Sequence, residues 1–215
     1  TFDHNGLGIL IDGTNISVNN QSRINGCEFL CTDGTISRSP LAGTIPNEHV
    51  VLNGINFNFP LGTSGSGTGT INYFSDAING VSISNSTVII QGNEFSRIYR
   101  IDDLNLATDY GRAINIRNSG SATNYYTEIK DNDFNDVNLG INVDNIIGSE
   151  LIINNNTFTN PNYQYDPNPS TVLFYNHRTA IKVQNPIASP AIRAEIYDND
   201  ITDFRIGIHA TNVED

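Results

Sequence analysis

The stretch LIINNNTFTN, residues 151–160, places three consecutive asparagines between aliphatic residues and a phenylalanine. A helix would favour alanine or leucine at these positions, and an alternating strand would not hold three polar residues in a row. Asparagine bonds to nearby backbone groups and tolerates left-handed conformations, so the cluster predicts a tight bend. Whether the bend occurs once or many times decides the fold.

The bend recurs along the chain. Its template is an aliphatic residue, two residues, asparagine, one residue, and then phenylalanine or isoleucine. The copies are INGCEF (24–29), LNGINF (52–57), IQGNEF (90–95), IKDNDF (129–134), INNNTF (153–158) and IYDNDI (196–201). The fourth position holds Cys27 and Ile55 in the first two copies, and then Asn93, Asn132, Asn156 and Asn199. A recurring corner of this kind indicates a repeat architecture.

A second element lies between the bends and reads small residue, aliphatic, polar, aliphatic. Its copies are GILI (8–11), AINI (113–116), GINV (140–143), AIKV (180–183) and GIHA (207–210). The step from the end of a bend to this element is seven residues in four places, one of them Phe29 to Ile36. Three other steps are longer, which predicts three long corners at residues 59–77, 97–112 and 160–179.

Three short strands per repeat cannot bury an apolar face alone, so we expect successive repeats to stack on one another. Equivalent residues would then form columns, with the asparagines hydrogen-bonded as a ladder. One internal column would consist of Phe29, Phe57, Phe95, Phe134 and Phe158.

This pattern resembles the right-handed parallel β-helix of pectate lyase-like proteins, and the resemblance covers residues 2–209. It implies an all-β solenoid of about six to seven coils, one domain over residues 1–215, with long loops at one corner. In that family the asparagine corner joins the second and third sheets, so the second element would form the first sheet. The family's substrate cleft commonly lies across the outer face of that sheet.

The net charge of −12 argues against binding nucleic acid phosphates. No apolar run is long enough to span a membrane. Because the chain starts at Thr1 without a methionine or a signal peptide, we expect a fragment of a longer secreted or cell-surface protein with neighbouring domains. Two cysteines without a CxxC motif predict neither a disulfide framework nor a metal site. Acidic, asparagine-rich loops offer oxygen ligands that suit calcium, but no calcium-binding motif is present, and the cofactor is left open.

The outward residues of the first sheet form two predicted columns. The first contains Leu10, Ser37, Asn79, Asn115, Asn142, Lys182 and His209, and the second contains Asp12, Ser39, Arg117, Asp144, Gln184 and Thr211. In the third coil, counting favours a register on Ile78 over one on Val81.

A lyase needs a base and a cation that neutralises a uronic carboxylate, which makes Lys182, His209, Arg117 and Asp144 the candidate catalytic residues. Arg112 and Arg178 could hold a carboxylate through paired hydrogen bonds. The candidate substrate-binding residues also include Asn115, Asn142, Tyr163 and Tyr165, the two tyrosines as an aromatic platform for a sugar. We therefore expect a module that engages a polysaccharide or surface glycan, with or without lyase-like activity.

Other functions are less favoured. A glycosidase needs two nearby carboxylates, whereas Asp12 and Asp144 are four coils apart. The sequence motifs of β-helix polygalacturonases and epimerases are absent. The alternative hypothesis is a structural stalk or adhesin segment that binds a protein partner through its long loops.

Overall fold

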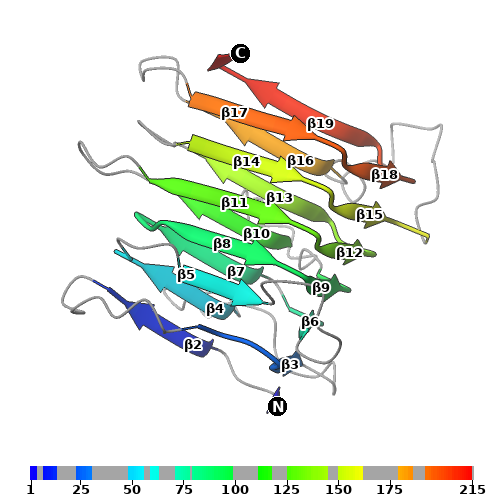
Figure 1. Ribbon diagram of the computed structural model, residues 1–215. Helices are drawn as coiled ribbons and strands as arrows, with labels where there is room; N and C mark the ends of the chain where they lie inside the picture. The colour runs from blue at the N-terminus through cyan, green and yellow to red at the C-terminus, as the bar shows by residue number, and fades with distance from the viewer. Residues whose placement is uncertain are drawn as a thin grey trace, which may run out of the picture.

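The computed structural model describes residues 1–3, 7–13, 23–30, 48–55, 59–62, 71–77, 79–98, 111–117, 125–144, 150–161, 179–185 and 192–214. These residues form twenty short strands and no helix (Figure 1). The strands belong to three parallel sheets, which we name A, B and C in the order in which the chain first enters them.

Sheet A contains β1 (Phe2–Asp3), β3 (Glu28–Leu30), β6 (Asn72–Ser75), β9 (Asn93–Ser96), β12 (Asp133–Asn135), β15 (Thr157–Thr159) and β18 (Asp200–Thr202). Sheet B contains β2 (Leu7–Asp12), β4 (Glu48–Asn53), β7 (Asn79–Ser84), β10 (Arg112–Arg117), β13 (Leu139–Asp144), β16 (Thr179–Gln184) and β19 (Ile206–Thr211). Sheet C contains β5 (Phe59–Gly62), β8 (Val88–Gln91), β11 (Tyr126–Lys130), β14 (Glu150–Asn154), β17 (Ile192–Tyr197) and β20 (Val213–Glu214).

The chain visits the sheets in the order A, B, C and then returns to A one strand further along the stack. Sheets A and B each have seven strands, so the described residues form seven coils, and an isolated bridge from Ile24 to Leu61 marks sheet C in the first coil. Figure 1 shows the coils stacked from the N-terminal end to the C-terminal end. The predicted fold, a right-handed parallel β-helix, is confirmed.

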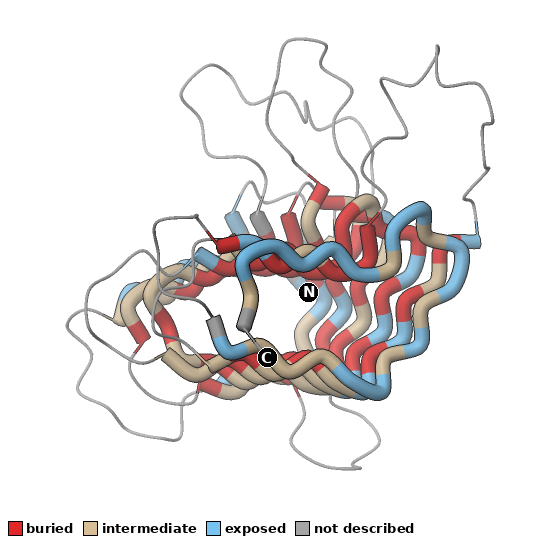
Figure 2. The backbone as a smooth tube through the Cα atoms, turned by 90° about the horizontal axis from the view of Figure 1, so that it is seen from above, coloured by how far each residue is buried: buried red, intermediate tan, exposed pale blue. Residues whose placement is uncertain are grey.

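The interior is filled by columns of identical or similar side chains. The stacked rings of Phe29, Phe74, Phe95, Phe134 and Phe158 form the largest column, with centroids 4.4 to 5.0 Å apart. All five rings are fully buried. Figure 2, which looks along the stack, shows buried residues alternating with more exposed ones around the coils.

The asparagine ladder runs along the corner between sheets C and A. Asn72, Asn93, Asn132, Asn156 and Asn199 are joined by amide hydrogen bonds of 2.9 to 3.0 Å, each donated to the side-chain oxygen in the next coil. Each amide also donates to a backbone carbonyl of sheet C, or of Ile24 in the first coil, as Asn156 does to Ile129 at 3.0 Å. The predicted ladder of Asn93, Asn132, Asn156 and Asn199 is confirmed, and Asn72 extends it.

The three consecutive asparagines have three separate roles. Asn154 ends β14 and donates from its side chain to the hydroxyl of Tyr197 at 3.1 Å. Asn155 adopts a left-handed φ of 54°, and Asn156 belongs to the ladder. Asp131 and Asp198 take the left-handed position in neighbouring coils, with φ of 54° and 53°. Asparagine and aspartate tolerate this conformation better than most residues, which explains their abundance at the corners.

In every sheet B strand except β4, a small residue begins the core-facing part, because the phenylalanine column or Ile201 lies against it. At Gly140, a Cβ atom would lie 2.6 Å from the carbonyl oxygen of Ala180 and 2.7 Å from the Phe158 ring. In β4 this position is occupied by His49, whose ring centroid lies 5.8 Å from that of Phe29.

The predicted register was wrong in the second and third coils. The sequence LNGINF was read as a corner, but residues 48–53 form β4 in sheet B, so Phe74 and Asn72 take the column positions predicted for Phe57 and Ile55. Strand β2 pairs directly with β4, so Val50 occupies the place predicted for Ile36. In the next coil, Val81, and not Ile78, pairs with Ile114.

The first predicted long corner was also wrong. Residues 59–62 form β5, and the residues that follow lead to β6 at the corner between sheets C and A. Long connections do join sheet A to sheet B between β9 and β10 and between β15 and β16, as predicted for residues 97–112 and 160–179, and a third lies between β3 and β4. The misreading has a local cause, because β4 has His49 in place of a small residue and Val51 in place of a polar one.

Candidate functional site

The candidate site is the outer face of sheet B, where two columns of side chains run along the stack. Registered pairs align Asn115 with Asn142, Asn142 with Lys182, and Lys182 with His209. These residues come from β10, β13, β16 and β19, and parallel strands about 4.8 Å apart place one of them on each consecutive coil. The predicted column from Asn115 to His209 is therefore confirmed, whereas its earlier members are Leu10, Val51 and Ser82.

Asn115 connects two strands of this face. Its side-chain oxygen accepts hydrogen bonds from Arg112 Nη1 at 3.1 Å and from Asn142 Nδ2 at 2.9 Å. The backbone nitrogen of Arg112 in turn donates to Asn79 Oδ1 at 3.4 Å. Asn142 is only 2% exposed although its column faces away from the core. In the central part of the face, amide and guanidinium groups are thus fixed in position by hydrogen bonds to one another.

The second column contains Asn53, Ser84, Arg117, Asp144, Gln184 and Thr211. Arg117 Nη2 lies 3.6 Å from Asp144 Oδ2, and both side chains are well exposed. At the C-terminal end, His209 Nε2 lies 3.4 Å from the hydroxyl of Thr211. Asp12 lies on β2, four strands from Asp144, so these two carboxylates do not meet.

Some predicted site residues are not placed. Arg178, Tyr163 and Tyr165 lie outside the described residues, as do Ser37 and Ser39. Asn79 is described, but it pairs with Arg112 and not with Asn115. Its side chain supports Arg112 from the neighbouring strand.

His49 is a buried titratable group that the repeat pattern did not predict. His49 is 2% exposed, and its Nε2 lies 2.9 Å from the carbonyl oxygen of Ser75. Burial lowers the pKa of His49 to about 4, partly opposed by the bond to Ser75 and the charge of Asp76. It faces the phenylalanine column and not the outer surface, so its role is in the core. Its position opposite Gly8 is the sequence signal that could have identified it.

The described residues include no group of three or more histidine, cysteine, aspartate or glutamate side chains placed to hold a metal ion. Cys27, at the start of the asparagine column, is a free thiol. Within the described part of the chain, no helix is long and apolar enough to cross a membrane.

Comparisons of the chain with protein-family models, with curated proteins and with solved structures found no match. The parallel β-helix is therefore established by strand pairing alone, and the pectate lyase-like family remains a prediction.

Proposed function

We propose that the outer face of sheet B binds an acidic polysaccharide, in a protein that acts outside the cell or on its surface. The observation that carries the proposal is the column Asn115, Asn142, Lys182 and His209, in which the buried Asn142 holds Asn115 and the last two coils place the basic residues Lys182 and His209 side by side. A linear polymer aligned with the stack would pass Asn115 and then meet Lys182 and His209 on consecutive coils.

The chemistry of the face favours an anionic ligand. Arg112 and Lys182 provide cationic donors for carboxylate or sulfate groups, and the amide of Asn115 suits sugar hydroxyls. With a net charge of −12, the protein would repel a polyanion everywhere except at such a local group of cations.

Binding is the activity that we propose for this face, and turnover is not required for it. Arg117 and Asp144 lie close enough to form an ion pair with each other, which suits a positioning role beside the first column. Lyase activity would appear as unsaturated uronate products in the same experiments.

The test is a calorimetric titration of the full chain with polygalacturonate and with alginate, which measures the affinity for each polymer. Dextran is the neutral control. We expect binding of an acidic polymer that weakens as salt is added. Lys182→Ala and Arg117→Ala should each weaken binding by roughly two- to fivefold, the scale of a partly exposed ionic contact.

Arg193→Ala is the matched control, because Arg193 is an exposed cation on sheet C that contacts Glu195 at 2.8 Å. It should bind as the wild type does. Equal losses in all three variants would show non-specific attraction. If neither acidic polymer binds and a protein ligand is found instead, the stalk or adhesin hypothesis replaces this one.

A further inference from the structure

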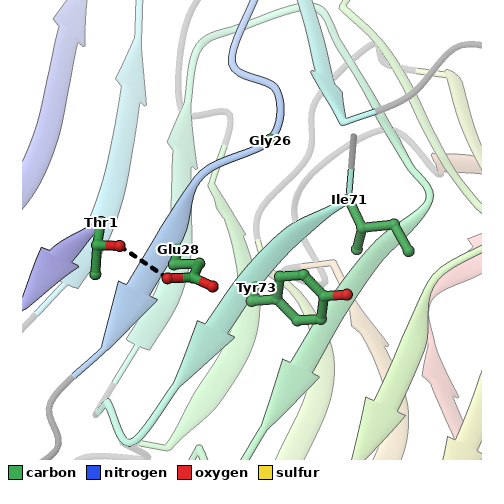
Figure 3. Close-up of a pocket in the computed structure, with 5 residues that line it drawn as sticks. All are labelled: Thr1, Gly26, Glu28, Ile71 and Tyr73. Carbon is green, nitrogen blue, oxygen red and sulfur yellow. Dashed lines mark hydrogen bonds between the residues drawn. The ribbon is translucent and has the colours of Figure 1, made fainter. Parts of the chain in front are cut away.

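A pocket of about 340 Å³ lies on the outer side of sheet A, beside β3 and β6 near the N-terminal end of the stack. Thr1, Gly26, Glu28, Ile71 and Tyr73 line it (Figure 3). It is on a different sheet from the polysaccharide-binding face proposed above, and its role is independent of that proposal.

A glycine at the corner between sheets C and A borders the pocket. Gly26 occupies the left-handed corner position with φ of 65°, as Gly92 does with φ of 62°, whereas Asp131 and Asn155 hold this position in later coils. Its lack of a side chain leaves open space beside Ile71 and Tyr73, which are each 40% exposed. Both are among the exposed large hydrophobic side chains of the described residues, and together they form one wall of the pocket.

The opposite wall is a carboxylate. Glu28 is the registered partner of Tyr73 on the neighbouring strand. One of its oxygens, Oε2, accepts a hydrogen bond from the hydroxyl of Thr1 at 2.8 Å. Figure 3 shows the other oxygen on the side of Glu28 that faces Tyr73. An aromatic face and a carboxylate oxygen therefore border the same space.

The negative charge around the pocket favours a cationic ligand. Glu94 is the registered partner of Tyr73 on its other side, followed by Asp133 in the next coil. The described strand residues of sheet A include no lysine and no arginine. A polyanion would be repelled here. The side chains of the pocket offer mainly acceptors and a ring face, which match a group that only donates hydrogen bonds.

We propose that this pocket binds a cationic side chain, an ammonium or a guanidinium group, presented by a protein partner. The cation would lie against the ring of Tyr73, with its charge balanced by Glu28 and Glu94. Attraction to the ring and to a carboxylate at once is the arrangement by which proteins recognise ammonium groups. The aliphatic stem of a lysine or arginine would contact Ile71.

The experiment follows amide and aromatic NMR signals of the full chain during titration with Nα-acetyl-lysine methylamide. The norleucine analogue, which has the same carbon chain without the ammonium group, is the matched control, and glucose tests for a sugar site. We expect saturable shifts at Gly26, Glu28 and Tyr73 with the lysine compound alone.

Glu28→Gln and Tyr73→Leu should each weaken that binding by roughly two- to fivefold. Glu195→Gln, which removes the same charge from sheet C, should leave it unchanged. The proposal is overturned if the lysine compound gives no saturable shift up to its solubility limit or if norleucine binds equally well. Equal weakening by Glu195→Gln, or saturation by glucose in place of lysine, would also overturn it.

Discussion

Asn132 donates from its side-chain amide and from its backbone nitrogen to a single oxygen, Oδ1 of Asn156, at 3.0 and 3.1 Å. Asn93 makes the same pair of bonds to Oδ1 of Asn132, at 2.9 and 3.0 Å. Each asparagine therefore satisfies a buried backbone N–H of the preceding coil, and its side chain ties the two coils together.

Replacing Asn132 with alanine should lower the free energy of unfolding by about 2 to 4 kcal/mol, because the buried backbone N–H and side chain of Asn93 lose their acceptor. Urea denaturation followed by circular dichroism measures the change. Asn135→Ala is the control in the same coil, on the exposed side of β12, and should cost less than about 0.5 kcal/mol. Equal costs for the two variants would contradict the role given to the ladder.

Phe134→Ala should destabilise the protein by about 3 to 5 kcal/mol, because it removes a fully buried ring from the middle of the column. The ring centroids of Phe95 and Phe158 lie 5.0 and 4.4 Å away, so both neighbours would border the cavity. Phe134→Leu fills part of the space and should cost less. An unchanged melting temperature for Phe134→Ala would show that the column contributes little to stability.

Stability should fall as the pH is lowered from about 6.5 to about 4, in part because of His49. Its pKa is about 4 in the folded protein and near 6.5 when the chain is unfolded, so the unfolded state takes up a proton first. The loss of unfolding free energy that His49 causes is absent above pH 6.5. It is complete below pH 4, where it reaches about 3 kcal/mol.

Unfolding curves measured across this pH range would test the assignment. His49→Gln should flatten the pH dependence between pH 4 and 6.5, whereas Asn135→Ala, which removes no titratable group, should leave it as in the wild type. If the two variants retain the same pH dependence as the wild type, His49 is not the group responsible.

The sequence predicted the last four coils closely, because their corner column repeats asparagine and their core columns repeat aromatic or aliphatic residues. Asn93, Asn132, Asn156 and Asn199 occupy one position, and the interval between neighbouring columns is constant where connections are short. The prediction from sequence failed for β4, where His49 and Val51 do not match the repeat template. Spacing alone then favoured Ile36 and Ile78, whereas Val50 and Val81 occupy the corresponding positions of the strand register.

The candidate site was predictable to the same extent. The column from Asn115 to His209 follows from alternation along strands of known register. The contacts of Arg112 with Asn115, and of Arg117 with Asp144, depend on side-chain conformations that no spacing rule specifies. The pocket beside Tyr73 was not predicted, because it requires Asn72 to be a member of the ladder, and the sequence had placed Ile55 there.

By itself, the sequence determined that this chain is a stack of coils with asparagine at one corner and phenylalanine inside. Those features are local, because a left-handed bend and an inward aromatic ring need only the residues beside them. Only the tertiary structure decided which strands are neighbours across the long connections. Strand register there depends on which apolar surface covers the coil below. Because the connections vary in length, the spacing of residues in the sequence does not indicate which strand provides that surface.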